Sequence, residues 1–142
     1  MDDILLDTNV LSEFIKPRPD PAVLLFLDTI EVSWLCSITF HELNFGAERS
    51  PDARRRAKLL AWIERLRSEF AGRTIPVDDE IAAQSGRLKA AAAADGKIVS
   101  VVDALIAAAA HTRGLRVATR NIKDFKPLGV ALVNPWIEPT RR

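Results

Sequence analysis

The chain has 142 residues, a length typical of one domain, and 48% of them are hydrophobic, so it can bury a core of its own. Its 20 basic and 19 acidic side chains leave a net charge of +1, which excludes a general electrostatic attraction to nucleic acid or to anionic membranes. Any binding of a polyanion must therefore come from local clusters of charge.

Cysteine usage and the ends of the chain bear on its location. The one cysteine, Cys36, lies in an apolar run, which predicts a buried thiol in a reducing compartment and leaves no partner for an intrachain disulfide. The first residues, Met1-Asp2-Asp3, lack the positive charge of a secretory signal. No apolar run approaches the roughly 18 residues that a membrane span requires. We therefore expect a cytoplasmic protein with a single domain over residues 1–142 and no membrane association.

Short apolar runs alternate along the chain with segments of helical periodicity. In chain order, the pattern predicts a strand over 4–6, helices over 9–15 and 22–30, a strand over 32–36, helices over 37–49 and 52–70, a strand over 74–77, helices over 78–94 and 101–111, and strands over 116–119 and 131–133. Strands that alternate with helices in this way indicate an α/β layer fold with a mostly parallel sheet.

Three acidic residues, far apart in the sequence, stand at strand ends or helix starts. Asp7 ends the first strand, and Glu42 and Asp103 fall in the first turns of predicted helices. Each could simply cap a helix, because Thr39 and Ser100 precede Glu42 and Asp103 at the spacing of a capping box. In a parallel sheet, however, ligands bind beyond the carboxyl ends of the strands, where these acids would converge. Converging carboxylates repel unless a cation lies between them, so the pattern predicts a site for a hard metal ion.

A further contribution to this site is expected just after the strand over 116–119. Asn121 and Asp124 are both candidates, although asparagine and aspartate are also ordinary turn residues.

Several segments, spread from one end of the chain to the other, are similar to the motifs of one protein family. These segments are Leu6-Asp7-Thr8-Asn9-Val10-Leu11-Ser12-Glu13, residues 37–43, residues 95–98 leading to 103–107, residues 118–121 with 124–125, and Asn134-Pro135-Trp136. In order and spacing they resemble a PIN-domain ribonuclease, namely the VapC-type toxin of a type II toxin–antitoxin system, in its FitB-like branch.

The resemblance implies a three-layer α/β/α fold with a mostly parallel central sheet, and Asp7, Glu42 and Asp103 as the metal-binding acids. Many members carry a fourth acid where this chain has Asn121. Asp124 lies one helical turn further on and could substitute for it through a water molecule. This departure leaves open whether one metal ion or two are bound.

The reaction that the resemblance implies is hydrolysis of RNA phosphodiester bonds with Mg²⁺, for which Mn²⁺ could substitute. Oxygen ligands without a Cys/His cluster favour these ions over zinc. Asp7 and Asp103 are expected to bind the metal, and Glu42 to hold the attacking water or to accept its proton. The residues expected to position substrate or water are Thr8, Asn9, Thr119 and Arg120. Further cations that could contact RNA are Lys16, Arg18 and the group at 54–56.

The resemblance also implies partners. We expect a homodimer, silenced by a cognate antitoxin that connects this chain to DNA only indirectly. Apolar side chains that could contact a partner are Phe14, Leu24, Phe26, Phe45, Trp62 and Phe70, although core packing would explain most of them.

Three other interpretations remain open from the residues alone. The chain could be a catalytically weak PIN-domain binding module, a reading that Asn121 leaves open. It could be an aspartate-based phosphotransferase, but that chemistry needs a second aspartate where Asn9 stands. A phospho-acceptor receiver domain is the weakest of the three, because Asp2 and Asp3 precede the first strand instead of ending it.

Overall fold

The computed structural model describes residues 3–137 of the chain, and they form a parallel sheet between two layers of helices. The sheet has five strands in the order β3-β2-β1-β4-β5, and every pairing is parallel. Its strands are β1 (Asp3–Leu6), β2 (Val32–Cys36), β3 (Thr74–Ile75), β4 (Arg116–Ala118) and β5 (Leu132–Val133). The fold class predicted from the sequence is confirmed.

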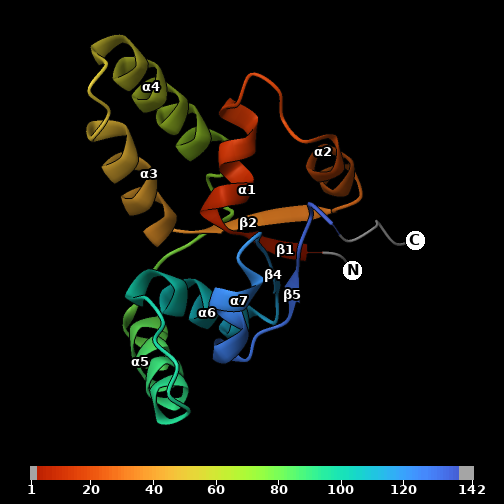
Figure 1. Ribbon diagram of the computed structural model, residues 1–142, viewed down its shortest axis with the longest axis vertical. Helices are drawn as coiled ribbons and strands as arrows, with labels where there is room; N and C mark the ends of the chain where they lie inside the picture. Colours follow the sequence, from red (N-terminus) through yellow and green to blue (C-terminus); the bar gives the residue numbers. More distant parts are fainter. Residues whose placement is uncertain (1–2, 138–142) are drawn as a thin grey trace.

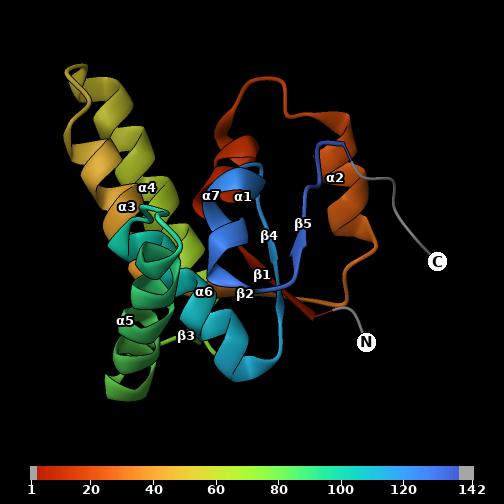
Figure 2. The ribbon, with the colours of Figure 1, turned by 60° about the horizontal axis from the view of Figure 1, so that its bottom comes forward.

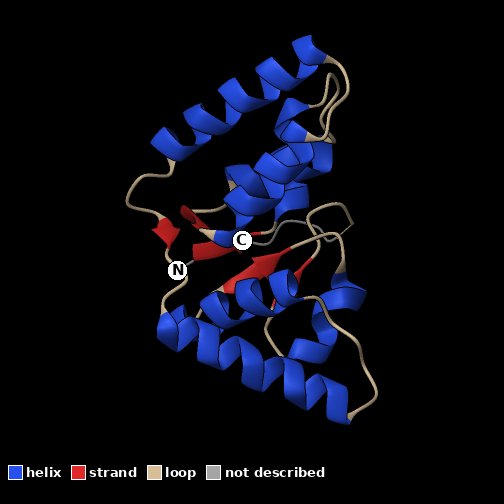
Figure 3. Cartoon of the chain, turned by 90° about the vertical axis from the view of Figure 1, so that its left-hand side faces the viewer, coloured by secondary structure: helices blue, strands red, loops and turns tan. Residues whose placement is uncertain are grey.

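The helices fall into two groups, one on each face of the sheet (Figures 1 and 3). One group is α1 (Thr8–Ser12), α2 (Pro21–Asp28), α3 (Ile38–Glu48) and α4 (Ala53–Glu69). The other is α5 (Asp79–Ala94), α6 (Val101–Arg113) and α7 (Ile122–Phe125). Short 3₁₀ turns follow α1 and α7, over Glu13–Ile15 and Lys126–Leu128. No helix within residues 3–137 is long and apolar enough to cross a membrane.

Strand β1 lies at the centre of the sheet and is apolar on both faces. Its side chains point alternately to the two sides, so Ile4 and Leu6 join the core under α1–α4 while Leu5 joins the core under α5–α7. The core under α5–α7 also includes the alanine run of α6, residues 107–110, which is buried all around the helix and whose small side chains let neighbouring elements pack closely. A continuous apolar run is the pattern that a doubly covered parallel strand requires.

Some element boundaries differ from those predicted, each for a local reason. Strand β3 stops at Ile75 instead of residue 77, because Pro76 has no N–H to donate to a neighbouring strand. The first helix keeps α-helical form only to Ser12 and then tightens into a 3₁₀ turn. Helix α7 was not predicted, since four residues with one buried anchor, Phe125, show no periodicity.

Of the two expected capping boxes, one is wrong. Helix α3 begins at Ile38, so Thr39 lies inside it, and the buried Thr39 hydroxyl has no hydrogen-bond partner among residues 3–137. Ser100, in contrast, caps α6 as expected and accepts a hydrogen bond from the Asp103 N–H at 3.0 Å. Glu42 is therefore not held in place by a cap, whereas Asp103 is.

Candidate active site

Asp7 is fixed where the central strand ends and α1 begins. Its side chain is only 5% exposed, and each oxygen accepts one hydrogen bond. Oδ1 accepts from the main-chain N–H of Thr8 at 2.8 Å, which makes Asp7 the N-cap of α1. Oδ2 accepts from the hydroxyl of Thr119 at 2.7 Å. The parallel pairing of β1 with β4 brings Thr119 to this place, because the Asp7 N–H donates to the Ala118 carbonyl at 2.9 Å.

Thr8 links the first acid to the second. Its main-chain N–H binds Asp7, while its hydroxyl donates a short hydrogen bond to Oε1 of Glu42 on α3. The two acids, 35 positions apart in the sequence, therefore lie on either side of a single threonine. The sequence predicted that Thr8 positions substrate or water, which stays a prediction; the structure shows Thr8 as a hydrogen-bond donor to both acids.

Asp103 lies in the first turn of α6, half-buried, on the other helical layer. Burial raises its pKa from the ordinary aspartate value of 3.8 to about 6, and the charges of Asp7 and Asp124 add to the rise. Burial also raises the pKa of Asp7, with smaller contributions from the charges of Glu42 and Asp124. The pKa of Glu42 is raised by burial first and then by the charge of Asp103. Each of these three pKa values is thus raised in part by a charge from the same set of four carboxylates, which indicates that the four lie in one region of the molecule.

Polar side chains around Thr119 complete the network. The Thr119 hydroxyl, which donates to Asp7, accepts from the main-chain N–H of Asn121 at 2.9 Å and is 3.5 Å from Nδ2 of Asn9. Oδ1 of Asn9 in turn accepts from the main-chain N–H of Arg120 at 3.4 Å. Asn121 thus contributes a main-chain contact at the start of α7, while Asp124, one turn later, is exposed and contributes its charge.

The sequence of this chain matches one known protein family. The family described as "PIN domain" matches residues 4–129. The chain belongs to the PIN-domain family. This PIN domain is 40% identical over 139 residues to the protein named VapC ribonuclease Y4jK of Sinorhizobium fredii, with 94% of this chain and 97% of that protein covered. It is 37% identical over 136 residues to the protein named toxin FitB of Neisseria gonorrhoeae, with 94% and 98% covered.

Solved structures of FitB-type and VapC-type complexes are also similar to this chain. The crystal structure of FitAcB from Neisseria gonorrhoeae matches this PIN domain with a TM-score of 0.87 at 36% identity, covering 95% of this chain and 99% of that one. The DNA-bound VapBC from Salmonella typhimurium matches with a TM-score of 0.76 at 30% identity, covering 95% and 99%. The family resemblance inferred from the sequence motifs is confirmed.

The chemistry of the donor set of this PIN domain fits a hard divalent cation. All its candidate ligands are oxygens, and their mutual repulsion would be relieved by a bound cation. Within residues 3–137, however, no three His, Cys, Asp or Glu side chains are grouped closely enough to hold a metal ion by themselves. Mg²⁺ suits such a site, since it is usually bound by one or two carboxylates together with waters and substrate phosphates.

The raised pKa values predict how the stability of the metal-free protein depends on pH. Between pH 3.8 and about 6 the folded protein holds a proton on Asp103 that the unfolded chain has released. Its contribution to stability is therefore lost as pH rises through about 6 and regained as pH falls. We expect the melting temperature in EDTA to increase by a few degrees from pH 7.5 to 5, as measured by circular dichroism. Asp103→Asn should flatten this rise, and an unchanged slope in the variant would contradict the assignment.

Two features of the PIN domain were not found from the sequence. Glu13, which the sequence gave no role, is only 2% exposed and is paired with Lys16. Its neighbours in the chain, Ser12 and Phe14, gave no signal that its carboxylate turns inward. Trp136 was noted only as part of a motif, yet its ring lies 5.0 Å from the guanidinium carbon of Arg120.

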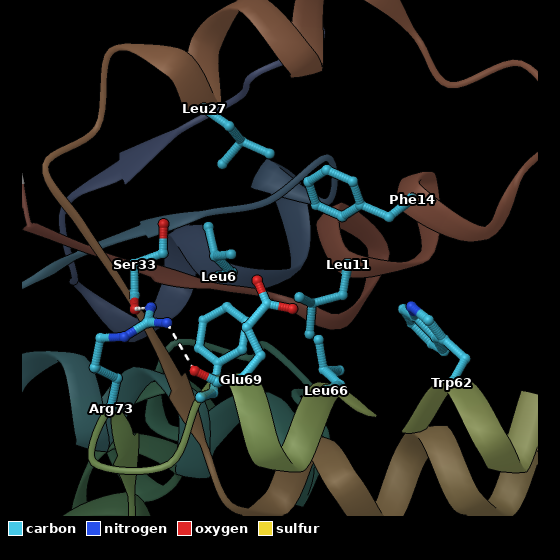
Figure 4. Close-up of a pocket in the computed structure, with 10 residues that line it drawn as sticks. Leu6, Leu11, Phe14, Leu27, Ser33, Trp62, Leu66, Glu69 and Arg73 are labelled. Carbon is cyan, nitrogen blue, oxygen red and sulfur yellow. Dashed lines mark hydrogen bonds between the residues drawn. The ribbon is translucent and has the colours of Figure 1, made fainter. Parts of the chain in front are cut away.

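The apolar residues expected to contact a partner divide into two sets. Phe26 and Phe70 belong to the core, whereas Phe14, Leu24 and Phe45 are exposed. Phe14 and the half-buried Trp62 line a pocket of about 250 Å³ between α1, α2 and α4 (Figure 4). Its inner wall is held by Arg73, whose guanidinium donates to the carbonyls of Ser33 and Glu69 at 2.6 and 2.9 Å. None of the four carboxylates lines this pocket, so it is distinct from the candidate active site.

Proposed function

We propose that this protein is a metal-dependent endoribonuclease and the toxin of a toxin–antitoxin pair. The observation that supports the proposal is the coupling of Asp7, Glu42 and Asp103. Thr8 links the first two by hydrogen bonds, and the pKa of each of the three is raised by burial and also by the charge of another. Relatives over nearly the whole chain are named VapC ribonuclease, toxin and, at 32% identity, the tRNA(fMet)-specific endonuclease VapC of Salmonella typhimurium.

In this proposal the side chains of the candidate active site have different roles in phosphodiester hydrolysis. Asp7 and Asp103 would hold Mg²⁺, with Mn²⁺ as a substitute. When bound, such an ion neutralises phosphate charge and makes a water molecule more acidic. Glu42, with its pKa raised, is suited to take the proton of the attacking water, and Thr8 holds its carboxylate in place. Thr119 fixes the orientation of Asp7, as supporting hydrogen bonds commonly do for catalytic carboxylates.

Asn121 and Asp124 have different roles in this proposal. Asn121 contributes its main-chain N–H to Thr119, so this contact does not depend on whether an acid or an amide stands at position 121. Asp124 keeps a negative charge close enough to raise the pKa of Asp7 and Asp103. We propose that it acts on the site through water, and that one metal ion is bound more tightly than a second.

The partners follow from the same comparisons. Solved relatives include complexes titled FitAB bound to a DNA fragment and DNA-bound VapBC. We propose a cognate antitoxin as the partner of this chain, with DNA contacted only through that antitoxin, and a homodimer as the toxin's own assembly. The cytoplasm, where RNA is abundant and Cys36 stays reduced, is the proposed location.

The direct test is RNA cleavage by the purified protein under controlled metal content. We expect cleavage of a transfer RNA mixture with Mg²⁺, loss of cleavage with excess EDTA, and recovery when Mg²⁺ or Mn²⁺ is restored, followed on denaturing gels. Cleavage that persists in EDTA would refute the metal requirement. Absence of cleavage with either ion, in protein shown to be folded, would refute the ribonuclease proposal.

A further inference from the structure

A second pocket, of about 490 Å³, lies between the loop that joins α1 to α2 and the chain that follows β5. Figure 2 shows these two segments meeting beside α2. Besides two prolines, its lining residues are Glu13, Lys16, Arg18, Asp20, Arg120 and Trp136. We call it the arginine pocket. Three of these six side chains are cationic and two are acidic, and one of the acids, Glu13, is paired with Lys16.

The arginine pocket is built around the buried Glu13. Its Oε1 accepts from the main-chain N–H of Asp20 at 2.9 Å, and its Oε2 pairs with the ammonium group of Lys16. The hydrogen bond from Lys16 is the main cause of a lowered pKa for Glu13, to which the charge of Arg120 also contributes. Glu13 therefore stays ionised and holds the two ends of the loop over residues 13–20 together. Three prolines within residues 17–21 restrict the backbone of that loop further.

This arrangement leaves two guanidinium groups for a ligand. Lys16 is already paired, whereas Arg18 is exposed and makes no hydrogen bond or ion pair with any residue in the described range 3–137. Arg120 is exposed and packs over the ring of Trp136, a contact that orients its guanidinium without using its N–H donors.

The arginine pocket adjoins the candidate active site through Arg120. The main-chain N–H of this residue donates to Asn9, and its neighbour Thr119 donates to Asp7. A cluster of carboxylates repels an anionic strand, so cations must lie beside it for RNA to approach. Arginine suits this task, because its planar fork can bind two oxygens of one phosphate.

We propose that the arginine pocket binds an RNA phosphate that neighbours the cleaved one, through Arg18 and Arg120, with Glu13 as the residue that positions the loop. This inference rests on the proposed ribonuclease function and deepens it, because it assigns a place to the substrate strand. The other cations considered from the sequence, the group at 54–56 on α4, do not line this pocket. One of them, Arg56, donates a hydrogen bond to the carbonyl of Ser50.

The test measures RNA binding in the Asp7→Asn protein, which should hold RNA without cutting it. The probe is a fluorescently labelled transfer RNA mixture, followed by anisotropy at several salt concentrations. Arg18→Ala and Arg120→Ala should each weaken binding by roughly tenfold, the loss expected for one charge-assisted hydrogen bond. Each should also reduce the slope of log affinity against log salt by about one. Arg120→Lys, which keeps the charge but not the fork, should weaken binding less than Arg120→Ala.

The matched control is Arg87→Ala, which removes one exposed cation from α5, on the opposite helical layer. It should leave affinity and salt slope unchanged. Arg18→Ala removes no hydrogen bond or ion pair within residues 3–137, so it should leave the fold intact, and alanine at position 120 retains the main-chain bond to Asn9. The melting temperature of each variant checks this. If both arginine variants bind like Arg87→Ala while the unmodified protein still cleaves RNA, the pocket is wrongly assigned and the ribonuclease stands. If the same variants bind RNA like Arg87→Ala but lose binding to poly-glutamate, the pocket takes acidic peptides and the RNA assignment fails.

Discussion

Replacing Asp7 with asparagine is expected to reduce RNA cleavage by on the order of a thousandfold or more. The substitution removes one of the negative charges that would bind the metal ion, and a loss of several kcal/mol of transition-state stabilisation corresponds to that factor. The fold should survive, because asparagine caps helices as well as aspartate does and the Thr119 hydroxyl can accept as well as donate. Removal of a buried charge that its neighbours repel should leave the metal-free melting temperature unchanged or higher.

The control for this substitution is Asp78→Asn. Asp78 also caps a helix, α5, and accepts from the Ile81 N–H at 2.9 Å, so the chemical change is the same outside the carboxylate cluster. Rates of cleavage of the transfer RNA mixture should be indistinguishable from those of the unmodified protein. If Asp7→Asn kept a tenth or more of the activity, or melted several degrees lower than Asp78→Asn, a capping role would account for Asp7 better than a catalytic one.

The largest expected effect on stability comes from Phe125→Ala. Phe125 is completely buried, and it anchors α7 in the core beneath α5 and α6. Truncation of a buried phenylalanine removes apolar contact and leaves a cavity, which costs about 3–5 kcal/mol of the free energy of unfolding. The same helix carries Asp124 and begins beside Asn121, so cleavage should fall as well. Chemical denaturation monitored by circular dichroism measures the first effect.

Lys123→Ala supplies the comparison on the same helix. Lys123 is exposed on α7, and alanine there should change the free energy of unfolding by less than about 0.5 kcal/mol. A loss below 1 kcal/mol for Phe125→Ala would mean that the core closes around the missing ring and that α7 does not depend on this anchor.

The fold was largely predictable from the sequence, because its strands have a recognisable pattern of apolar residues. The continuous apolar run of β1 is what a strand covered on both faces requires, and the proline- and glycine-marked breaks place most helices correctly. Local sequence signals failed where the same spacing of residues is compatible with two different local structures. Thr39 and Ser100 both precede an acid at capping-box spacing, but only Ser100 caps its helix, because α3 starts one residue before Thr39.

The candidate site was predictable as a set of acids but not as a network. Strand order brings Asp7 beside Thr119, and the sequence predicted both to be near the site. The bridge from Thr8 to Glu42 and the inward turn of Glu13 depend on side-chain directions that no local pattern records. The sequence named Arg18 and Arg120 as cations that could contact RNA, but it did not predict that they would line one pocket.

The pairing of β1 with β4 has a consequence for synthesis of the protein. The hydroxyl that orients Asp7 belongs to a residue 112 positions later, and the strand beside it is synthesised after β1, β2 and β3. A nascent chain on the ribosome therefore carries its first acid long before the segment that aims it has emerged. Until β4 has been made, Asp7 lacks the Thr119 hydroxyl that orients it, so this hydrogen-bond network can form only after synthesis has passed residue 119.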